Sequence, residues 1–184
     1  MDDAFYVKAI EDRKKELLQD TKWINRVLNE VKSVCANSSF IRCLALGQMS
    51  EYINPRFQLA LLLIIAEELH ITTITAWDPI FTPTDVRLLN HYGIQVCEEN
   101  PEPTPNVFWY VPHGPLKLVT ELPQKIGSAV YFGNDLAKFD TSSESLIKYR
   151  DTTRIFSVEP SSKDRWYPAF NATAIHSKAE EDSF

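Results

Sequence analysis

Cysteine is scarce in this sequence, and the scarcity limits how the chain can be held together. The three cysteines are Cys35, Cys43 and Cys97, an odd number with no Cys-x-x-Cys pair. A disulfide framework and a structural zinc site are therefore not expected. Cys43 lies within an apolar run, where a thiol behaves as a small hydrophobic side chain. The pattern is typical of a reducing compartment, and we expect the cytoplasm, with the nucleus as a further location.

Long apolar runs and an excess of positive charge are also lacking. The longest apolar run, Leu59 to Ala66, is far shorter than the roughly 18 residues needed to span a bilayer. The N-terminus has no basic region followed by apolar residues, so no signal peptide is expected. The chain carries 25 acidic and 19 basic residues, a net charge of −6. Neither nucleic acid nor an anionic membrane is an expected partner, because both attract surfaces rich in Lys and Arg.

What is present is a regular alternation of predicted strands and helices after a helical start. Residues 3–36 have the three- and four-residue apolar spacing of helices, with Asp20 or Thr21 as the cap of a second helix. We therefore expect a helical segment at 1–36 that packs on a core domain at 37–177, followed by a polar, flexible tail at 178–184.

Within the core domain, short apolar runs bounded by turn residues predict six strands. They are expected at 41–46, 72–77, 94–97, 107–111, 128–132 and 154–158, with helices at 55–69, 83–91, 115–122 and 143–150. Asn54 and Pro55 are the predicted start of the first of these helices, and Gly93 the end of the second. The alternation predicts an α/β fold, a Rossmann-like, doubly wound, mostly parallel sheet of order 3-2-1-4-5 with a sixth strand.

In that order the ligand crevice lies beyond the carboxyl ends of strands one and four. Glycines follow the first, fourth and fifth strands, and polar residues lie beside them. The candidate ligand-binding residues on this edge are Gly47, Gln48, Ser50, Asp78, His113 and Asn134. Each also has an ordinary structural explanation: glycines make tight turns, Asp before Pro starts a turn, and His113 is held between two prolines.

No complete catalytic or cofactor motif accompanies these residues. The turn after the first strand has a single glycine, Gly47, so it is neither a G-x-G-x-x-G dinucleotide loop nor a P-loop. Ser50, His113 and Asp78 are the residue types of a hydrolytic triad, but the G-x-S-x-G nucleophile elbow is absent. The four histidines show no spacing that favours a metal site. No catalytic residue is assigned.

Several motifs in this order resemble the SRR-type domain, named for "sensitivity to red light reduced". They are Leu46-Gly47 with Ser50, Arg56-Phe57-Gln58, Asp78-Pro79-Ile80-Phe81, Pro112-His113, Gly133-Asn134 and Phe170-Asn171-x-Thr173-x-x-His176. The chain departs from the pattern in the short loop Glu98 to Pro105 and at Ser177, where an aromatic residue is usual.

The resemblance implies a regulatory, non-enzymatic protein in circadian or light signalling, or in the control of haem metabolism. Such a protein would act through protein partners or a small ligand. The resemblance adds Arg56 and Gln58 to the candidate site. Arg56 at a helix start would suit an anion, or would pair with Asp78 or Glu51 to brace the site.

Two other functions remain open from the sequence. The first is an enzyme or degenerate enzyme on a methyltransferase-like sheet that binds S-adenosylmethionine or a nucleotide, supported by fold analogy alone. Methyltransferases carry an antiparallel seventh strand, and Pro160 and Pro168 in the segment after Val158 argue against one here. The second is haem binding, for which the spacing of histidines and cysteines gives no support.

Overall fold

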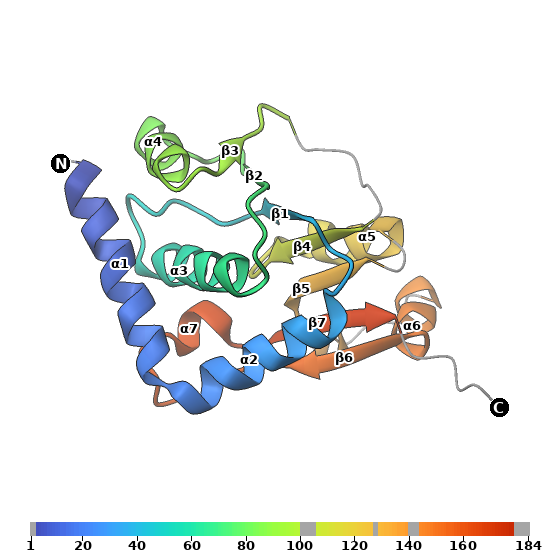
Figure 1. Cartoon of the computed structure of the whole chain (residues 1–184). Helices are drawn as coiled ribbons and strands as arrows, with labels where there is room; N and C mark the ends of the chain where they lie inside the picture. Colours follow the sequence, from blue (N-terminus) through green and yellow to red (C-terminus); the bar gives the residue numbers. More distant parts are fainter. Residues whose placement is uncertain (1–2, 100–105, 127–128, 140–143, 179–184) are drawn as a thin grey trace.

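The chain folds around one seven-stranded sheet, shown by a computed structural model that describes residues 3–99, 106–126, 129–139 and 144–178 (Figure 1). The sheet order is β3-β2-β1-β4-β5-β7-β6. The strands are β1 (Phe40–Leu44), β2 (Ile74–Trp77), β3 (Gln95–Val96), β4 (Val107–Val111), β5 (Val130–Asn134), β6 (Thr153–Ser157) and β7 (Thr173–Lys178). The predicted order 3-2-1-4-5 is confirmed, and these five strands are parallel.

The helices form layers on both faces of the sheet. One face carries α3 (Ile53–Glu68) and α4 (Pro83–His91), with α1 (Asp3–Gln19), α2 (Thr21–Val34) and the short α7 (Tyr167–Phe170) around them. The other face carries α5 (Leu116–Ile126) and α6 (Glu144–Asp151), which contact each other. A short 3-10 helix, η1 (Leu136–Lys138), follows β5.

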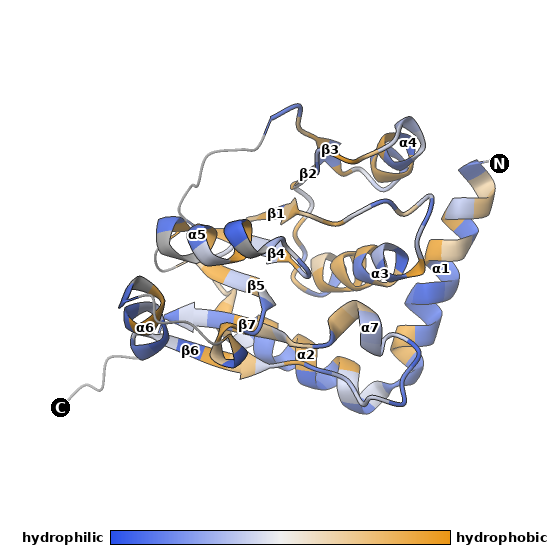
Figure 2. Ribbon diagram, turned by 180° about the vertical axis from the view of Figure 1, so that it is seen from behind, coloured by the Kyte–Doolittle hydropathy of each residue, from blue (hydrophilic) through white to orange (hydrophobic). Residues whose placement is uncertain are grey.

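Helix α3 lies at the centre of the larger core. Its residues from Phe57 to Ala66 are all buried, because α3 packs between the sheet and α1, α2 and α7. Figure 2 shows the hydrophobic colouring along much of this helix. The longest apolar run of the sequence, Leu59 to Ala66, therefore forms the centre of the core. Among the described residues, no helix is long and apolar enough to cross a bilayer.

The two N-terminal helices join the same core. Asp20 caps α2, as predicted, by accepting a hydrogen bond from the backbone N of Trp23 at 3.0 Å. The Trp23 indole lies against Phe170 and donates its Nε1 hydrogen to the carbonyl of Val158 at 2.8 Å. Helix α2 is thus tied to the last third of the chain. The division into a helical segment and a core domain stays a prediction.

The prediction against a seventh strand is wrong. Strand β7 lies between β5 and β6 and is antiparallel to both. Pro160 and Pro168, which argued against it, both precede its first residue, Thr173, so neither interrupts its hydrogen bonds. The sequence around β7 lacks the alternation of an edge strand because five of its six residues, from Thr173 to Ser177, are buried.

Two smaller predictions differ from the structure, and a third is confirmed. Helix α3 begins at Ile53 with Tyr52 as its N-cap residue, so Asn54 does not cap it. Gly133 lies within β5 rather than after it. Gly93 follows the end of α4 with a φ of 72°, as predicted. Most of the loop Glu98 to Pro105 and the tail after Lys178 lie outside the described residues.

Candidate functional site

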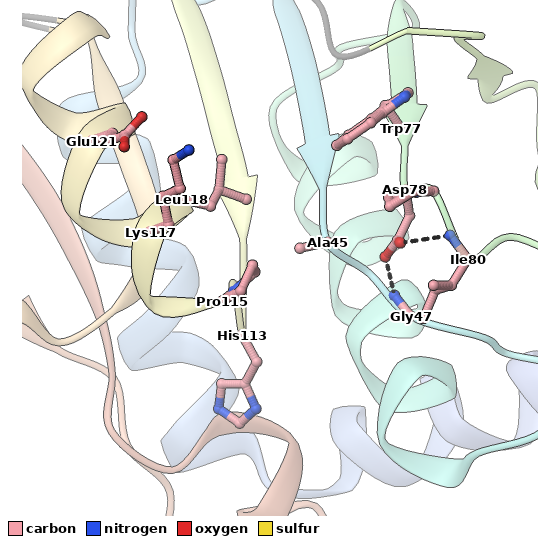
Figure 3. A pocket seen from close by; sticks show the side chains of 11 residues that line it. Ala45, Gly47, Trp77, Asp78, Ile80, His113, Pro115, Lys117, Leu118 and Glu121 are labelled. Carbon is pink, nitrogen blue, oxygen red and sulfur yellow. Dashed lines mark hydrogen bonds between the residues drawn. The ribbon is translucent and has the colours of Figure 1, made fainter.

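A pocket of about 730 Å³ lies at the carboxyl edge of the sheet, between the ends of β1, β2 and β4 and the start of α5. We call it the switch-point pocket, because the strand order reverses between β1 and β4. Its lining residues are Ala45, Gly47, Trp77, Asp78, Pro79, Ile80, His113, Pro115, Lys117, Leu118 and Glu121 (Figure 3). Three of the eight candidate residues, Gly47, Asp78 and His113, therefore lie around one cavity.

The turn after β1 has an unusual backbone. Ala45 has a φ of 51° and Gly47 a φ of 82°, so two of three consecutive residues adopt the left-handed region. Glycine takes this conformation at little cost, but alanine does so at a cost. A β-carbon at Gly47 would also lie 3.0 Å from Cγ of Pro55 in α3. The turn is therefore held close to the start of α3, and its strained backbone faces the pocket.

Asp78 connects the turns after β1 and β2. Its Oδ2 accepts a hydrogen bond from the backbone N of Gly47 at 2.9 Å, and its Oδ1 accepts one from the backbone N of Ile80 at 3.1 Å. Each carboxylate oxygen has a second lone pair, so both remain able to accept a bond from a ligand. The carboxylate also uses the one glycine N–H of the turn, which a bound phosphate would otherwise take.

His113 lies on the opposite wall, at the end of β4. Its Nε2 donates a hydrogen bond to the carbonyl oxygen of Asn171 at 3.0 Å, which orients the ring. The neighbouring Gly114 donates its backbone N–H to Oδ1 of Asn134 at 3.1 Å. Asn134 does not line the pocket, and its side chain fixes the turn that carries His113.

The sequence interpretation missed two walls of the pocket. Trp77 is the last residue of β2 and supplies a large aromatic ring beside Asp78. Helix α5 supplies Lys117, Leu118 and Glu121 at adjacent positions along one face. The sequence did contain a sign of each wall. Trp77 directly precedes the candidate residue Asp78, and the predicted helix that became α5 directly follows the candidate residue His113.

Gln48 and Ser50 lie beside the switch-point pocket rather than in its lining. Gln48 donates from Nε2 to the carbonyl of Ile80 at 2.9 Å. Ser50 donates its backbone N–H to Oδ1 of Asp85 at 2.7 Å, and its hydroxyl is 3.2 Å from that of Thr82. Gln48 thus fixes the turn after β1 to the segment between β2 and α4, and Ser50 fixes it to the first turn of α4 and to its N-cap residue.

Asp85 is the centre of that second connection. It is fully buried, and its Oδ2 accepts hydrogen bonds from the backbone N and the hydroxyl of Thr82, at 2.9 and 2.7 Å. Thr82 accepts in return from the backbone N of Asp85, which completes a capping box at the start of α4. One carboxylate therefore caps α4 and holds the turn after β1.

Arg56 and Gln58 face away from the switch-point pocket. Arg56 donates from Nε to the carbonyl of Met49 at 2.7 Å and from Nη2 to that of Ser50 at 3.1 Å. It therefore braces the turn through backbone oxygens, and neither Asp78 nor Glu51 is its partner. Gln58 is 3% exposed and donates from Nε2 to the carbonyl of Ala169 at 3.0 Å, joining α3 to α7.

The nucleophilic and titratable side chains near the turn form no catalytic triad or metal cluster within the part of the chain that the structure describes. Burial, and to a smaller extent the charge of Asp78, raises the pKa of the Cys43 thiol well above its usual value, so Cys43 stays protonated beneath the turn. Among the described residues, no hydrogen bond joins Ser50, His113 and Asp78 into a triad, since each has other partners. The same part of the chain contains no cluster of three or more His, Cys, Asp and Glu side chains suited to a metal ion.

Comparison with known proteins identifies relatives of this chain. It is 31% identical over 90 residues to the SRR1-like protein of Mus musculus, an alignment that covers 44% of this chain and 36% of the mouse protein. The chain thus spans about a third of the length of this relative. No solved structure matches it. The family model of the SRR1 domain matches residues 16–177, and since this is most of the chain, the protein belongs to the SRR1 domain family.

Proposed function

We propose that this protein is a regulatory protein that binds a nucleoside-bearing small molecule, such as S-adenosylmethionine, in the switch-point pocket. The observation that carries the proposal is the combination of Asp78 and Trp77 at the end of β2 with a cavity of about 730 Å³ beside them. In nucleotide-binding sheets of this order, an acidic residue after the second strand binds the ribose hydroxyls. Asp78 has a free lone pair on each oxygen for such a pair of hydroxyls.

The pocket favours a nucleoside over a nucleotide. Most of its wall is apolar, with Ala45, Trp77, Ile80 and Leu118 available to contact a base. A pyrophosphate needs free backbone N–H groups at a glycine-rich turn, and the N–H of Gly47 is already bonded to Asp78. The two carboxylates of Asp78 and Glu121 would also repel a phosphate, against the single cation of Lys117.

Binding of haem in the switch-point pocket is supported less well than binding of a nucleoside. A haem iron needs an axial ligand from the protein, and His113 is the only histidine or cysteine among the described residues that line the pocket. Its Nε2 already donates to Asn171.

The role in circadian or light signalling or in haem control, exercised through protein partners in the cytoplasm or nucleus, is the part of the proposal that rests on the family resemblance.

A second function, methyl transfer, is favoured by one specific observation. Strand β7 is antiparallel and lies between β5 and β6, which is the added strand that a methyltransferase-like, Rossmann-like sheet carries. Fold analogy alone carries this step, and His113 at the pocket is suited to act as a general base. A methyl-transfer assay becomes informative once S-adenosylmethionine is shown to bind.

The test is a thermal-shift and calorimetric titration with S-adenosylmethionine, adenosine, ATP and haem. We expect S-adenosylmethionine and adenosine to raise the melting temperature by mass action, and ATP and haem to have smaller effects. Asp78→Ala and the pocket-filling variant Leu118→Trp should abolish the shift, and Ser50→Ala, which lies outside the lining, should retain it. If no nucleoside binds, or if Leu118→Trp binds as well as the wild type, the proposal is wrong.

A further inference from the structure

A second pocket, of about 340 Å³, lies between α1 and the start of α3, and it shares no lining residue with the switch-point pocket. We call it the α1–α3 pocket. Four cationic side chains line it: Lys8 and Arg13 from α1, Arg56 from α3, and Arg165 from the segment before α7. Asp12 is the one carboxylate among its lining residues. In a chain of net charge −6, such a local excess of positive charge is the opposite of the overall balance.

Two of the four cations share a single carboxylate. Nη1 of Arg13 lies 3.4 Å from Oε2 of Glu16, and Nη1 of Arg165 lies 3.7 Å from the same oxygen. The Nε of Arg13 is shielded from solvent and has no hydrogen-bond partner among the described residues. Its guanidinium group also lies over the ring of Phe57, with 5.1 Å to the ring centre, which limits its freedom to move. The positive charge here is therefore only partly neutralised.

The other two cations form no ion pair within the described part of the chain. Arg56 is held rigidly, because its Nε and Nη2 bind backbone carbonyls and its guanidinium lies 5.6 Å from the ring centre of Tyr6. Neither of these two hydrogen bonds uses Nη1 of Arg56, so the N–H groups of Nη1 can donate to a ligand. Lys8 is exposed and adds a mobile charge to the rim of the pocket.

Apolar groups lie beside these charges. Phe5 is 50% exposed and Ile53 is 41% exposed, and both line the pocket. Ile53 is also the first residue of α3, whose N-cap residue Tyr52 makes no side-chain capping bond. Because Ile53 lines the pocket, the positive end of the α3 dipole adds to the attraction for an anion that the four cations provide.

We infer that the α1–α3 pocket binds the phosphate group of a small phosphate monoester whose organic part is apolar or aromatic. Guanidinium groups match phosphate oxygens through paired hydrogen bonds, and the fixed Arg13 and Arg56 supply such donors on two sides. Phe5 and Ile53 are placed to contact the organic part. This site is independent of the nucleoside site, since the two pockets lie on different elements and share no residue.

The test is calorimetric titration of the full chain with phenyl phosphate, inorganic phosphate, phenol and phenyl sulfate. We expect phenyl phosphate to bind more tightly than the other three, with an affinity that falls as salt is added. Lys8→Gln and Arg13→Gln should each weaken binding by about tenfold, a typical loss for one charged hydrogen bond. Lys15→Gln is the matched control, an exposed cation two turns further along α1 that does not line the pocket.

Three results would overturn the inference. They are no binding of phenyl phosphate to the folded wild type, equal binding of all four probes, or unchanged binding in Lys8→Gln and Arg13→Gln. Since Lys8 is exposed and forms no ion pair among the described residues, Lys8→Gln should fold normally and keeps the test decisive if Arg13→Gln does not. Leu118→Trp should leave phenyl phosphate binding unchanged, which separates this inference from the proposed nucleoside function.

Discussion

The carboxylate of Asp78 accepts a 2.9 Å hydrogen bond from the backbone N of Gly47, across the carboxyl ends of two neighbouring strands. This contact joins the turns after β1 and β2 into one wall of the switch-point pocket. It depends on the left-handed backbone of Gly47, whose φ of 82° directs the N–H toward Asp78. The turn geometry and the carboxylate therefore form one structural unit.

The first prediction tests the turn at Gly47. Gly47→Ala should lower the free energy of unfolding by about 2–4 kcal/mol, the sum of left-handed strain and contact with Pro55. The β-carbon would lie 3.0 Å from Cγ of Pro55, in a rigid ring. Gly93→Ala is the matched control, since Gly93 has a φ of 72° with no atom within 4 Å of a β-carbon. Urea unfolding should show a loss of only about 1–2 kcal/mol for Gly93→Ala, and equal losses in the two variants would contradict the role of Pro55.

The second prediction concerns the buried Asp85. Asp85→Asn replaces a carboxylate that accepts from Ser50 and twice from Thr82 with an amide whose NH₂ group cannot accept. We expect a loss of about 2–3 kcal/mol in the free energy of unfolding, the cost of leaving buried donors unpaired. Ser50→Ala keeps the backbone bond to Asp85 and should cost less than about 1 kcal/mol. A larger loss in Ser50→Ala than in Asp85→Asn would disprove this assignment.

These residues also show how far the sequence carried the prediction. The order of five strands could be predicted from the alternation of strands and helices and from the right-handed crossovers between parallel strands. That order in turn placed Gly47, Asp78 and His113 at one edge of the sheet, where they line one pocket. The sequence could not show that Ser50 bonds to Asp85, because that contact joins a loop to the first turn of α4, and their relative position is set by packing. Asp85 lies in the first turn of α4, where acidic residues are common, so its residue type and position give no sign of this contact.

Side-chain direction was the other limit. Arg56 and Gln58 lie at the start of α3. The helical periodicity of the sequence predicts that they lie on a helix, but it does not predict which neighbouring element each side chain contacts. Gln58 points to α7, a four-residue helix that has no periodic signal in the sequence. Strand β7 was missed for a related reason, since a fully buried strand has no alternation to reveal it. Both features depend on the last third of the chain folding back onto the core.

The third prediction tests the connection between α3 and α7. Gln58 is buried, and its amide donates to the carbonyl of Ala169. Gln58→Glu removes that donor and places a carboxylate opposite a carbonyl oxygen, so at pH 8 we expect a loss of at least about 3 kcal/mol. The loss should shrink at pH 5, where the acid takes up a proton. Gln48→Glu, at a more exposed position, is the control and should change the unfolding free energy by less than about 1 kcal/mol. A pH-independent loss would show that the carboxylate is not desolvated.

The fourth prediction concerns the pH dependence of stability. His176 is fully buried, and its Nε2 donates to the carbonyl of Asn134 at 3.0 Å. Its Nδ1 has no partner among the described residues, and the rings of Tyr131 and Tyr149 lie 5.0 and 5.9 Å away. Burial lowers the pKa of His176 from 6.5 to about 4, and the hydrogen bond to the carbonyl of Asn134 offsets this effect only in part. Burial also raises the pKa of both tyrosines, so neither is charged in this range.

Between pH 6.5 and about 4 the unfolded chain therefore binds a proton at His176 that the folded chain does not. Stability should fall as the pH falls through this window, by about 3 kcal/mol in total. Chemical unfolding at half-unit pH steps measures the slope. His176→Leu should flatten it, and His91→Gln, at an exposed helix end, should leave it unchanged. If His176→Leu keeps the full slope, the loss of stability in acid comes from other groups, and the neutral His176 between β5 and α6 is not its cause.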